Sequence, residues 1–434
     1  MEGKTSEKKE RKMRDSGIPW IGEVPNGWGM SPLKYNYNII AGATPDSTKQ
    51  NFWDGNIKWI TPADYKTKDV YVSFGKRNLT SAGYKACSTH MLPKGSIVIS
   101  KRAPIGSVAI TTSDLCTNQG CLGLVAKNKF VNNKYFYYVL SIYDDVLNLY
   151  GSGTTFKEIS ANVFSNIEFP LPSVTIQNSI ADFLDSKCSE IDTLIENLRA
   201  RMESAKEYKK AVITEAVTKG LDKDAKMKDS GVEWIGEIPE GWKVVRFKHI
   251  ASIKSNLVQP DKYMKYPQIA PDNIEKDTGR LLSHQTVDES GIISGNHLFY
   301  RGQILYSKIR PNLNKLTVAP FDGLCSADMY PIESKLPIIF MVYSMLSTYF
   351  VSQVSLIIQD RVKMPKINQE ELGEIKVVVP SQQEMLTIAD YLNSKCSEID
   401  ALLQNYEDQI TTLEEYKKSL IYEYVTGKKE VPVA

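Results

Sequence analysis

The chain has 434 residues, enough for two to four domains, of which 42% are apolar and 24% charged. No apolar run approaches the roughly 18 residues of a membrane span, and the charged start excludes a secretory signal. We therefore expect a protein of the prokaryotic cytoplasm, with no membrane partner. The six cysteines suit a reducing compartment. Cys116 and Cys121 lack accompanying histidines, so we expect no metal site.

The net charge of +2 conceals an uneven distribution of charge along the chain. Residues 181–210 hold six basic and seven acidic side chains, and residues 390–418 hold three and seven. These two stretches therefore carry −5, and the rest of the chain carries +7. Such segregation permits a polyanionic partner for the remainder but does not require one.

A box rich in glycine, proline and tryptophan follows the lysine-rich start at residues 13–28 and recurs at residues 227–242. The first copy ends in Trp-Ile-Gly-Glu-Val-Pro-Asn-Gly-Trp and the second in Trp-Ile-Gly-Glu-Ile-Pro-Glu-Gly-Trp. The glycines and prolines predict a turn-rich segment, and we expect the tryptophans to pack as anchors on the domain behind it. We interpret the box as structural rather than chemical.

Segments of strand character follow each box, at residues 95–102 and residues 302–310. Both alternate and are rich in β-branched or aromatic residues, which predicts two hairpin arms. Between these landmarks the halves diverge, because residues 40–90 have no convincing match to residues 254–297. This pattern suggests a duplicated frame that carries two different surfaces, although drift after duplication would leave the same trace. Tyr37, Trp53, Trp59 and Tyr65 suit a core better than base stacking.

A long helix is predicted at the end of each half, because apolar residues there fall alternately four and three apart, as in a coiled coil. The seam residues are Leu184, Cys188, Ile191, Ile195, Leu198, Met202, Leu392, Cys396, Ile399, Leu403, Tyr406 and Ile410. We expect about ten turns, or about 55 Å, in each helix. We also expect the first seam to pack against the second in antiparallel order, the alternative being that each packs on its own domain.

Local signals place the helix ends. Ser381 and Glu384 form a predicted capping box before the second helix. Gly220 and Gly427 are placed as the residues where the two helices stop.

The pair Ser-Lys-Cys-Ser-Glu-Ile-Asp, at residues 186–192 and 394–400, completes a specific pattern with the two boxes. The order of globular domain, long helix, globular domain and long helix resembles the specificity subunit of type I restriction-modification systems. The resemblance covers nearly the whole chain. It implies a mixed fold (α+β or α/β) with a pseudo-twofold repeat, in which two tandem target recognition domains are joined by two antiparallel helices in an intramolecular coiled coil. The expected divisions are residues 1–171, 172–220, 221–379 and 380–434.

The resemblance also implies partners and cofactors. Each recognition domain would read one half of a split site in double-stranded DNA, and the helices would act as a ruler and dock two modification (methyltransferase) subunits. Because the interiors of the two halves differ, we expect the target to be asymmetric. Restriction subunits, which are ATP-dependent translocases and nucleases, would join through them. S-adenosylmethionine, ATP and Mg are then expected on the partner subunits and not on this chain.

The chain lacks the sequence motifs of an enzyme. It has no phosphate-binding loop, no zinc-protease motif, no dinucleotide fingerprint and no adenine methyltransferase tetrapeptide. We therefore expect a non-catalytic subunit. The alternatives are a coiled-coil adaptor or structural protein with protein-binding domains, and a fused methyltransferase or nuclease.

Basic, amide and hydroxyl side chains in turns are the candidate DNA contacts, because they match phosphates and base edges. Most exposed lysines and arginines are merely solvated. These candidates are favoured because they lie in turns at the ends of the predicted strands. The candidates are Lys101, Arg102, Asn118, Gln119, Thr154, Thr155, Lys157, Lys308, Arg310, Asn312, Arg361, Lys363 and Lys366.

Overall fold

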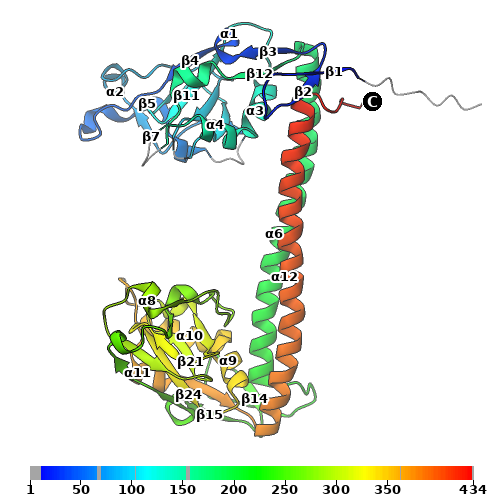
Figure 1. The fold of residues 1–434 in the computed structure, drawn as a ribbon. Helices are drawn as coiled ribbons and strands as arrows, with labels where there is room; N and C mark the ends of the chain where they lie inside the picture. The colour runs from blue at the N-terminus through cyan, green and yellow to red at the C-terminus, as the bar shows by residue number, and fades with distance from the viewer. Residues whose placement is uncertain (1–10, 66–69, 103, 153–156, 362, 433–434) are drawn as a thin grey trace, which may run out of the picture. The chain divides into compact units, whose positions relative to one another are not determined.

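The computed structural model describes residues 11–432, apart from residues 66–69, 103, 153–156 and 362. The chain divides into two compact units. Unit 1 comprises Met1–Asn197 with Gln409–Ala434, and unit 2 comprises Leu198–Asp408. Two long helices, α6 (Val174–Lys219) and α12 (Gln382–Val425), each contribute a segment to both units (Figure 1).

Unit 1 contains a five-stranded sheet in the order β4-β11-β8-β9-β6 and a three-stranded sheet in the order β10-β5-β7. The strands of the larger sheet are β4 (Tyr37–Ala41), β6 (Tyr71–Val72), β8 (Ile97–Ser100), β9 (Val108–Thr111) and β11 (Cys121–Ala126). Those of the smaller sheet are β5 (Trp53–Ile60), β7 (Arg77–Leu79) and β10 (Cys116–Thr117). The shorter helices are α1 (Leu33–Asn36), α2 (Ser81–Lys85), α3 (Asn133–Ser141), α4 (Asp144–Leu149) and α5 (Ala161–Ser165). Tyr37, Trp53, Trp59 and Tyr65 are all buried, as expected.

Unit 2 contains a four-stranded sheet in the order β16-β24-β21-β22 and a five-stranded sheet in the order β17-β20-β23-β18-β19. The first consists of β16 (Ala251–Ile253), β21 (Ile304–Ser307), β22 (Leu316–Val318) and β24 (Met329–Ser334). The second consists of β17 (Leu257–Val258), β18 (Pro267–Ile269), β19 (Gln285–Thr286), β20 (Asn296–Phe299) and β23 (Gly323–Cys325). The shorter helices are α7 (Phe247–Ile250), α8 (Val287–Ser290), α9 (Ile338–Leu346), α10 (Thr348–Ile358) and α11 (Gln369–Glu374).

The predicted hairpin arms are β8 and β21, and each pairs in antiparallel fashion with the next strand, β9 or β22. Strand order in unit 1, β4-β11-β8-β9, is repeated in unit 2 as β16-β24-β21-β22. Each unit also has a separate two-stranded antiparallel sheet: β3 (Gly29–Pro32) pairs with β12 (Glu168–Leu171) in unit 1, and β15 (Lys243–Arg246) pairs with β25 (Lys376–Val379) in unit 2.

Residues 40–90 and residues 254–297, which have no convincing match in sequence, nevertheless share one structural feature. In unit 1, β5 pairs in parallel with β10 through Ile60 and Thr117, and in unit 2, β18 pairs in parallel with β23 through Ile269 and Cys325. The sequence signal is short, Ile-Thr-Pro-Ala-Asp against Ile-Ala-Pro-Asp-Asn. Insertions and unlike exposed residues around it obscure the match.

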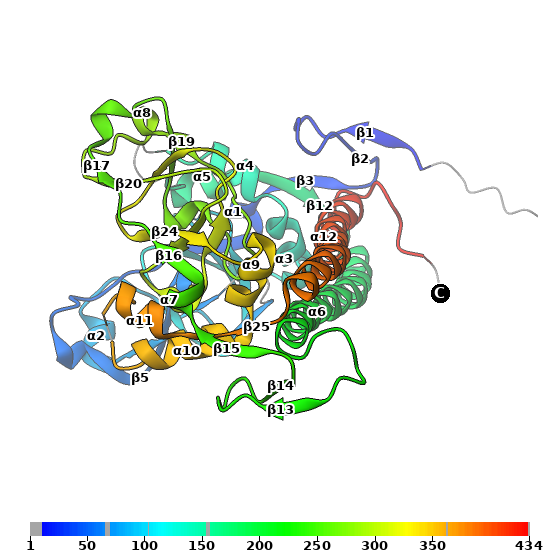
Figure 2. The ribbon, with the colours of Figure 1, turned by 90° about the horizontal axis from the view of Figure 1, so that it is seen from below.

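In each unit a segment of α6 lies beside a segment of α12 (Figures 1 and 2). In unit 1, the Lys417 ammonium lies 2.6 Å from the Asp192 carboxylate, and the rings of Phe183 and Tyr424 lie 4.5 Å apart. Residue numbers rise along α6 as they fall along α12, so the helices are antiparallel. In unit 2, Lys209 and Asp400 form the equivalent ion pair, also at 2.6 Å. Both partners of the second pair lie 208 residues from those of the first.

The predicted seam is buried, but its predicted register is wrong. Leu184, Cys188, Ile191, Ile195, Leu392, Cys396, Ile399 and Ile410 are buried, and Leu198, Met202, Leu403 and Tyr406 are partly buried. The two seams overlap only at their ends, because the ion pairs place Met202 level with residue 407 and Leu184 level with residue 425. In unit 2, the start of the second seam packs in one cluster with Val212, Ile213, Ala216 and Val217 of α6. The two antiparallel helices are of nearly equal length and lie side by side with their ends level. Each seam, which lies nearer one end of its helix, therefore packs mainly against the far end of the other helix.

The helix ends match the local signals. Glycines follow α6 and α12 at Gly220 and Gly427, with φ of +78° and +73°. The Ser381 amide and hydroxyl donate to the Glu384 carboxylate at 3.0 and 2.6 Å, which forms the predicted capping box. At 46 and 44 residues, or about 69 and 66 Å, both helices are longer than expected.

Each box forms a small hairpin that is fastened to the ends of the long helices. The strands are β1 (Met13–Asp15) with β2 (Glu23–Pro25), and β13 (Met227–Asp229) with β14 (Glu237–Pro239). In unit 1, the Tyr422 hydroxyl donates to the Ile21 carbonyl at 3.0 Å, and in unit 2, the Trp242 indole donates to Glu384 at 3.0 Å. Trp234 is 44% exposed, so the expectation that every box tryptophan is an anchor is wrong there.

Among the helices of the described residues, none is by itself long and apolar enough to cross a membrane. Only α9 and α10 together pass that test, and they are bent by 57° at their break.

The helix register can be tested with paired cysteines. A short thiol crosslinker should join Cys residues introduced as Asp192→Cys and Lys417→Cys, because these positions face each other in unit 1. Asp192→Cys with Leu402→Cys is the matched control, since the sequence-predicted register would bring that pair together. Peptide mass spectrometry reads the result, and crosslinking of the control pair within one chain would contradict the observed register.

The capping box also predicts a pH dependence of stability. Hydrogen bonding by the Ser381 hydroxyl, with help from Trp242, lowers the pKa of Glu384. A carboxylate with a lowered pKa stabilises the fold at pH above its unfolded value of about 4.3, and this contribution is lost as the pH falls through the folded value. Glu384→Gln should therefore cost at most about 1 kcal/mol at pH 7, since the residue is exposed to solvent.

Thermal melts from pH 7 down to pH 3 check this prediction. The melting temperatures of the wild type and Glu384→Gln should converge as the pH falls. Glu398→Gln, on the exposed face of the same helix, is the control. A difference between the wild type and Glu384→Gln that stays constant with pH would contradict the assignment.

Candidate nucleic-acid interface

Three loops of unit 1 meet at the point where β8 ends. The Lys101 amide donates to the Gly120 carbonyl at 2.9 Å, which joins the β8 loop to the loop after β10. The Ile159 amide donates to the Lys101 carbonyl at 2.9 Å, which joins both to the segment before α5. The described candidates of unit 1 are therefore brought together by backbone hydrogen bonds.

Unit 2 repeats this connection with different residues. The Lys308 amide donates to the Asp328 carbonyl at 2.9 Å, and the Ile367 amide donates to the Lys308 carbonyl at 3.0 Å. The loops after β21 and β23 thus meet the segment before α11. Each bond has its counterpart in unit 1 about 208 residues earlier, so the two surfaces are built on one frame.

Several candidate side chains in unit 1 already have partners within the chain. Lys101 lies 2.7 Å from Glu158, and its side chain is only 15% exposed. The Asn118 amide oxygen accepts from the Gly120 amide at 2.9 Å, and the Thr44 hydroxyl donates to Gln119. Gln119 and Lys157 are exposed and Arg102 is partly buried. Thr154 and Thr155 lie outside the described residues.

In unit 2 the candidates fall into two groups. Arg310, Asn312 and Lys363 are exposed. Lys308 is partly buried, and its ammonium lies 5.2 Å from the centre of the Tyr330 ring, which holds it by a cation–π contact.

The second group makes ion pairs. Arg361 donates to both carboxylate oxygens of Glu371, and the Lys366 ammonium lies 3.3 Å from Asp328. The hydrogen bond from Arg361 lowers the pKa of Glu371, so this pair is charged at neutral pH. Arg361 and Lys366 therefore neutralise carboxylates within the unit, and Lys366 does so at the exposed surface. We expect these two ion-paired cations to contribute less to phosphate binding than Arg310 and Lys363.

Arg310 has an unusual backbone. Its φ is +43° although it is not glycine, and it precedes Pro311, which normally disfavours this conformation. The Arg310 amide donates to the Pro365 carbonyl at 2.8 Å, which holds the loop in place. Strained residues of this kind cluster at functional sites, so the loop is a good candidate for a binding element.

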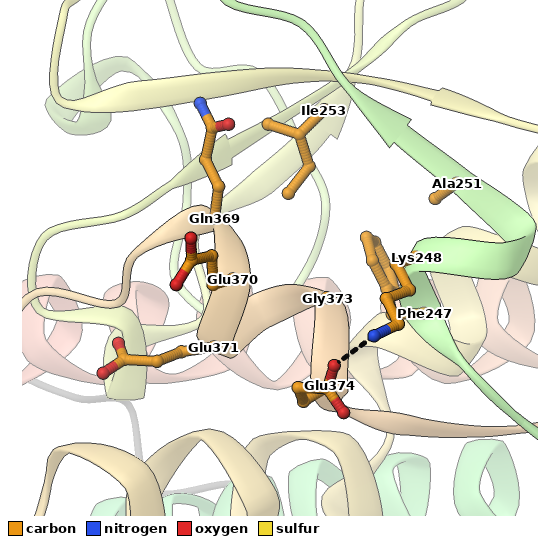
Figure 3. Close-up of a pocket in the computed structure, with 9 residues that line it drawn as sticks. All are labelled: Phe247, Lys248, Ala251, Ile253, Gln369, Glu370, Glu371, Gly373 and Glu374. Carbon is orange, nitrogen blue, oxygen red and sulfur yellow. Dashed lines mark hydrogen bonds and ion pairs between the residues drawn. The ribbon is translucent and has the colours of Figure 1, made fainter.

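A groove of about 620 Å³ lies on unit 2 between α7 and α11. Figure 3 shows Lys248 of α7 reaching Glu374 of α11, with Glu370 and Glu371 on the same helix. Two of these three carboxylates are matched by cations, because Arg361 pairs with Glu371 and both Lys248 and Arg246 pair with Glu374. None of the described candidate DNA contacts lines this groove, so it is not part of the candidate surface.

One element of the candidate surface was missed by sequence reasoning. A 3₁₀ turn follows β5 as η2 (Pro62–Asp64), and a matching turn follows β18 as η4 (Pro271–Asn273). The repeated Ile-x-Pro-x-Asp/Asn was its only signal. The Asn118 amide donates to the Ile60 carbonyl and the Ser326 amide donates to the Ile269 carbonyl, both at 2.9 Å, so each turn begins beside the candidate loops.

Comparisons with known proteins agree with this arrangement. The family model of the type I restriction modification DNA specificity domain matches residues 25–204. The EcoDI specificity subunit of Escherichia coli is 32% identical over 301 residues, which cover 65% of this chain and 68% of that protein. The MjaIX specificity subunit of Methanocaldococcus jannaschii is 26% identical over 430 residues, which cover 95% of both.

A solved structure from a study of complex assembly and conformational transition of the type I restriction-modification system has the same fold. Its TM-score is 0.69 at 13% identity, and the match covers 94% of this chain and 99% of that one. The similarity to the EcoDI subunit in sequence and length shows the family. The chain belongs to the specificity subunits of type I restriction enzymes, which are the non-catalytic components that recognise DNA in these systems.

Proposed function

We propose that this chain reads a bipartite, asymmetric target in double-stranded DNA, with one unit for each half-site, and that it recruits two methyltransferase subunits and, through them, restriction subunits. The observation that carries the proposal is the three-loop connection at Lys101, which recurs at Lys308 with unlike side chains around it. A repeated frame with two different surfaces suits two half-sites of different sequence. S-adenosylmethionine, ATP and Mg would be bound by the partner subunits, in the cytoplasm of a prokaryote.

The basic residues of the loop after β21, exposed Arg310 and partly buried Lys308, would bind phosphates. Each phosphate contact releases about one counterion, so affinity falls with salt in proportion to the number of contacts. Lys308 and Arg310 lie on one loop, with Asn312 beyond them. This loop is the first place to test for a phosphate contact.

Replacing Lys308 and Arg310 together by alanine should weaken DNA binding and reduce the salt slope by up to about 2. Binding is measured by gel shift on duplex DNA with the co-purified partner, at several salt concentrations. Lys223→Ala with Lys226→Ala removes the same charge from an exposed segment beside the second box and should leave the slope unchanged. An unchanged slope in the first variant, with an intact fold, would remove Lys308 and Arg310 from the interface.

Two equal apolar patches on the long helices support recruitment of two copies of one partner. Patch 1 consists of Leu194 and Tyr416, which are 52% and 55% exposed, and patch 2 consists of Leu402 and Tyr208, which are 43% and 54% exposed. Corresponding residues lie 208 positions apart. The ion pairs Asp192–Lys417 and Asp400–Lys209 place the two members of each patch at the same level of their unit.

Single exposed apolar residues are common, so it is the recurrence of the same exposed leucine and tyrosine at two matching sites that favours a contact surface. An ion pair lies beside each patch: Lys187, near Tyr416, lies 2.8 Å from Glu190, and Lys395, near Tyr208, lies 2.9 Å from Glu398. Because the patches match in both apolar and charged residues, they suit two copies of the same protein, here the methyltransferase subunit.

Leu194→Asp and Leu402→Asp test this recruitment. Each single variant should retain one methyltransferase subunit in place of two, and the double variant should retain none, because each substitution buries a charge in one contact. Native mass spectrometry of co-purified complexes gives the stoichiometry. Leu386→Asp is the matched control, since Leu386 is 44% exposed on α12 but has Asn178 as its counterpart. Two subunits retained by the double variant would contradict the assignment.

The bipartite target is tested by sequencing methylated sites in a host that carries this chain with its methyltransferase. We expect two unlike blocks separated by a gap of fixed length. A continuous or palindromic site would contradict one unit for each half-site. Absence of any sequence preference in DNA binding would favour the adaptor function instead.

A further inference from the structure

The turns that follow β5 and β18 have the same internal structure. In unit 1, the Thr61 amide donates to the Asp64 carboxylate at 2.8 Å, which closes the turn around Pro62. In unit 2, the Ala270 amide donates to the side-chain oxygen of Asn273 at 2.7 Å, which closes the turn around Pro271. Proline at the first position and this side-chain bond fix both turns in one conformation.

In unit 1, the turn lies directly against the candidate DNA loops. Gly120, in the loop after β10, has so little space around it that an added Cβ atom would lie 3.2 Å from Pro62 of the turn and 3.2 Å from the guanidinium of Arg102 after β8. The turn and the two loops therefore pack closely together at Gly120.

In unit 2, a lysine joins the turn to the loop that carries Lys308. The Lys315 ammonium donates to the Pro271 carbonyl at 2.8 Å. The carbonyl of Lys315 accepts from the Ser307 amide at 2.9 Å, directly before Lys308. The side chain of Lys315 is only 17% exposed, so this connection is mostly sheltered from water.

The two turns differ at their tips. The exposed tip residue is Ala63 in unit 1 and Asp272 in unit 2. The Asp272 side chain is fully exposed, and its only described ion pair is a 3.6 Å approach to Lys315. Two turns of the same conformation, with a methyl group at one tip and a carboxylate at the other, offer different chemistry to a bound duplex.

A fully exposed carboxylate needs an explanation on a surface proposed to bind DNA. Phosphates repel it, so it weakens binding to the backbone. Base edges, in contrast, present exocyclic amino groups in the major groove, and aspartate accepts hydrogen bonds from the N4 amino group of cytosine. An exposed carboxylate at this position therefore favours base reading over phosphate binding.

We propose that Asp272 is a base-reading residue, which accepts a hydrogen bond from an exocyclic amino group, cytosine N4 in the first place, in the half-site bound by unit 2. The assignment rests on the proposed function of the chain as a reader of a split site. Ala63 occupies the matching position in unit 1, where its methyl group suits contact with the methyl group of thymine. The difference between the tips then contributes to the difference between the half-sites.

Asp272→Ala is the test. Wild type and variant, each with the partner methyltransferase, are bound to a duplex library randomised over the target, and the bound DNA is sequenced. Asp272→Ala should lose about tenfold or more of its preference at one position of one half-site. Binding to non-specific duplex should be equal or stronger, with an unchanged salt slope, because a charge that repels phosphates has been removed.

Two further variants make the result specific. Glu240→Gln removes an exposed negative charge from the second box and should leave every position unchanged. Ala63→Asp should alter only the other half-site. An unchanged preference in a folded Asp272→Ala, or a change in both half-sites, would overturn the assignment. A wild type without any preference would instead overturn the proposed function, and the assignment with it.

Discussion

Each long helix presents an apolar stripe that water disfavours, and in this chain the stripe is covered by the other helix running in the opposite direction. Antiparallel pairing brings the N-terminal half of α6 together with the C-terminal end of α12 in unit 1, and the remaining halves together in unit 2. Because both helices carry the same repeat, the two pairings are chemically equivalent. The same ion pair occurs in both units, as Asp192–Lys417 and as Asp400–Lys209. The two exposed Leu–Tyr patches match in the same way.

Local patterns in the sequence predicted much of this frame. The seam, the capping box of Ser381 and Glu384, and the glycines after both helices depend on residues close together in the chain, so they were found correctly. The register of one long helix against the other was not predicted correctly. A heptad pattern is satisfied equally after a shift by seven residues, and the choice among registers depends on helix ends and on ion pairs between distant residues. The counterpart of η2 was missed because three residues are too weak a signal.

In the candidate site, too, local features were predictable from the sequence and long-range contacts were not. Turn residues of suitable chemistry were found from composition, and backbone bonds at Lys101 and Lys308 bring them together. The sequence alone does not distinguish exposed Arg310 from Arg361, whose charge is matched by Glu371. The partners of Lys101 and Lys366 lie 57 and 38 residues away along the chain, at Glu158 and Asp328, where no local pattern connects them. Contacts of this range are visible only in the folded chain.

The division of the chain has a consequence for its synthesis. Unit 2 is one continuous segment, Leu198–Asp408, whereas unit 1 needs both Met1–Asn197 and Gln409–Ala434. Chains emerge from the ribosome N-terminus first, so the unit that begins the chain is the last that can be completed. Until the end of α12 appears, Tyr135 lacks the Val425 carbonyl and Phe183 lacks the Tyr424 ring. A premature stop near residue 409 would therefore damage the N-terminal recognition unit and leave the C-terminal one whole.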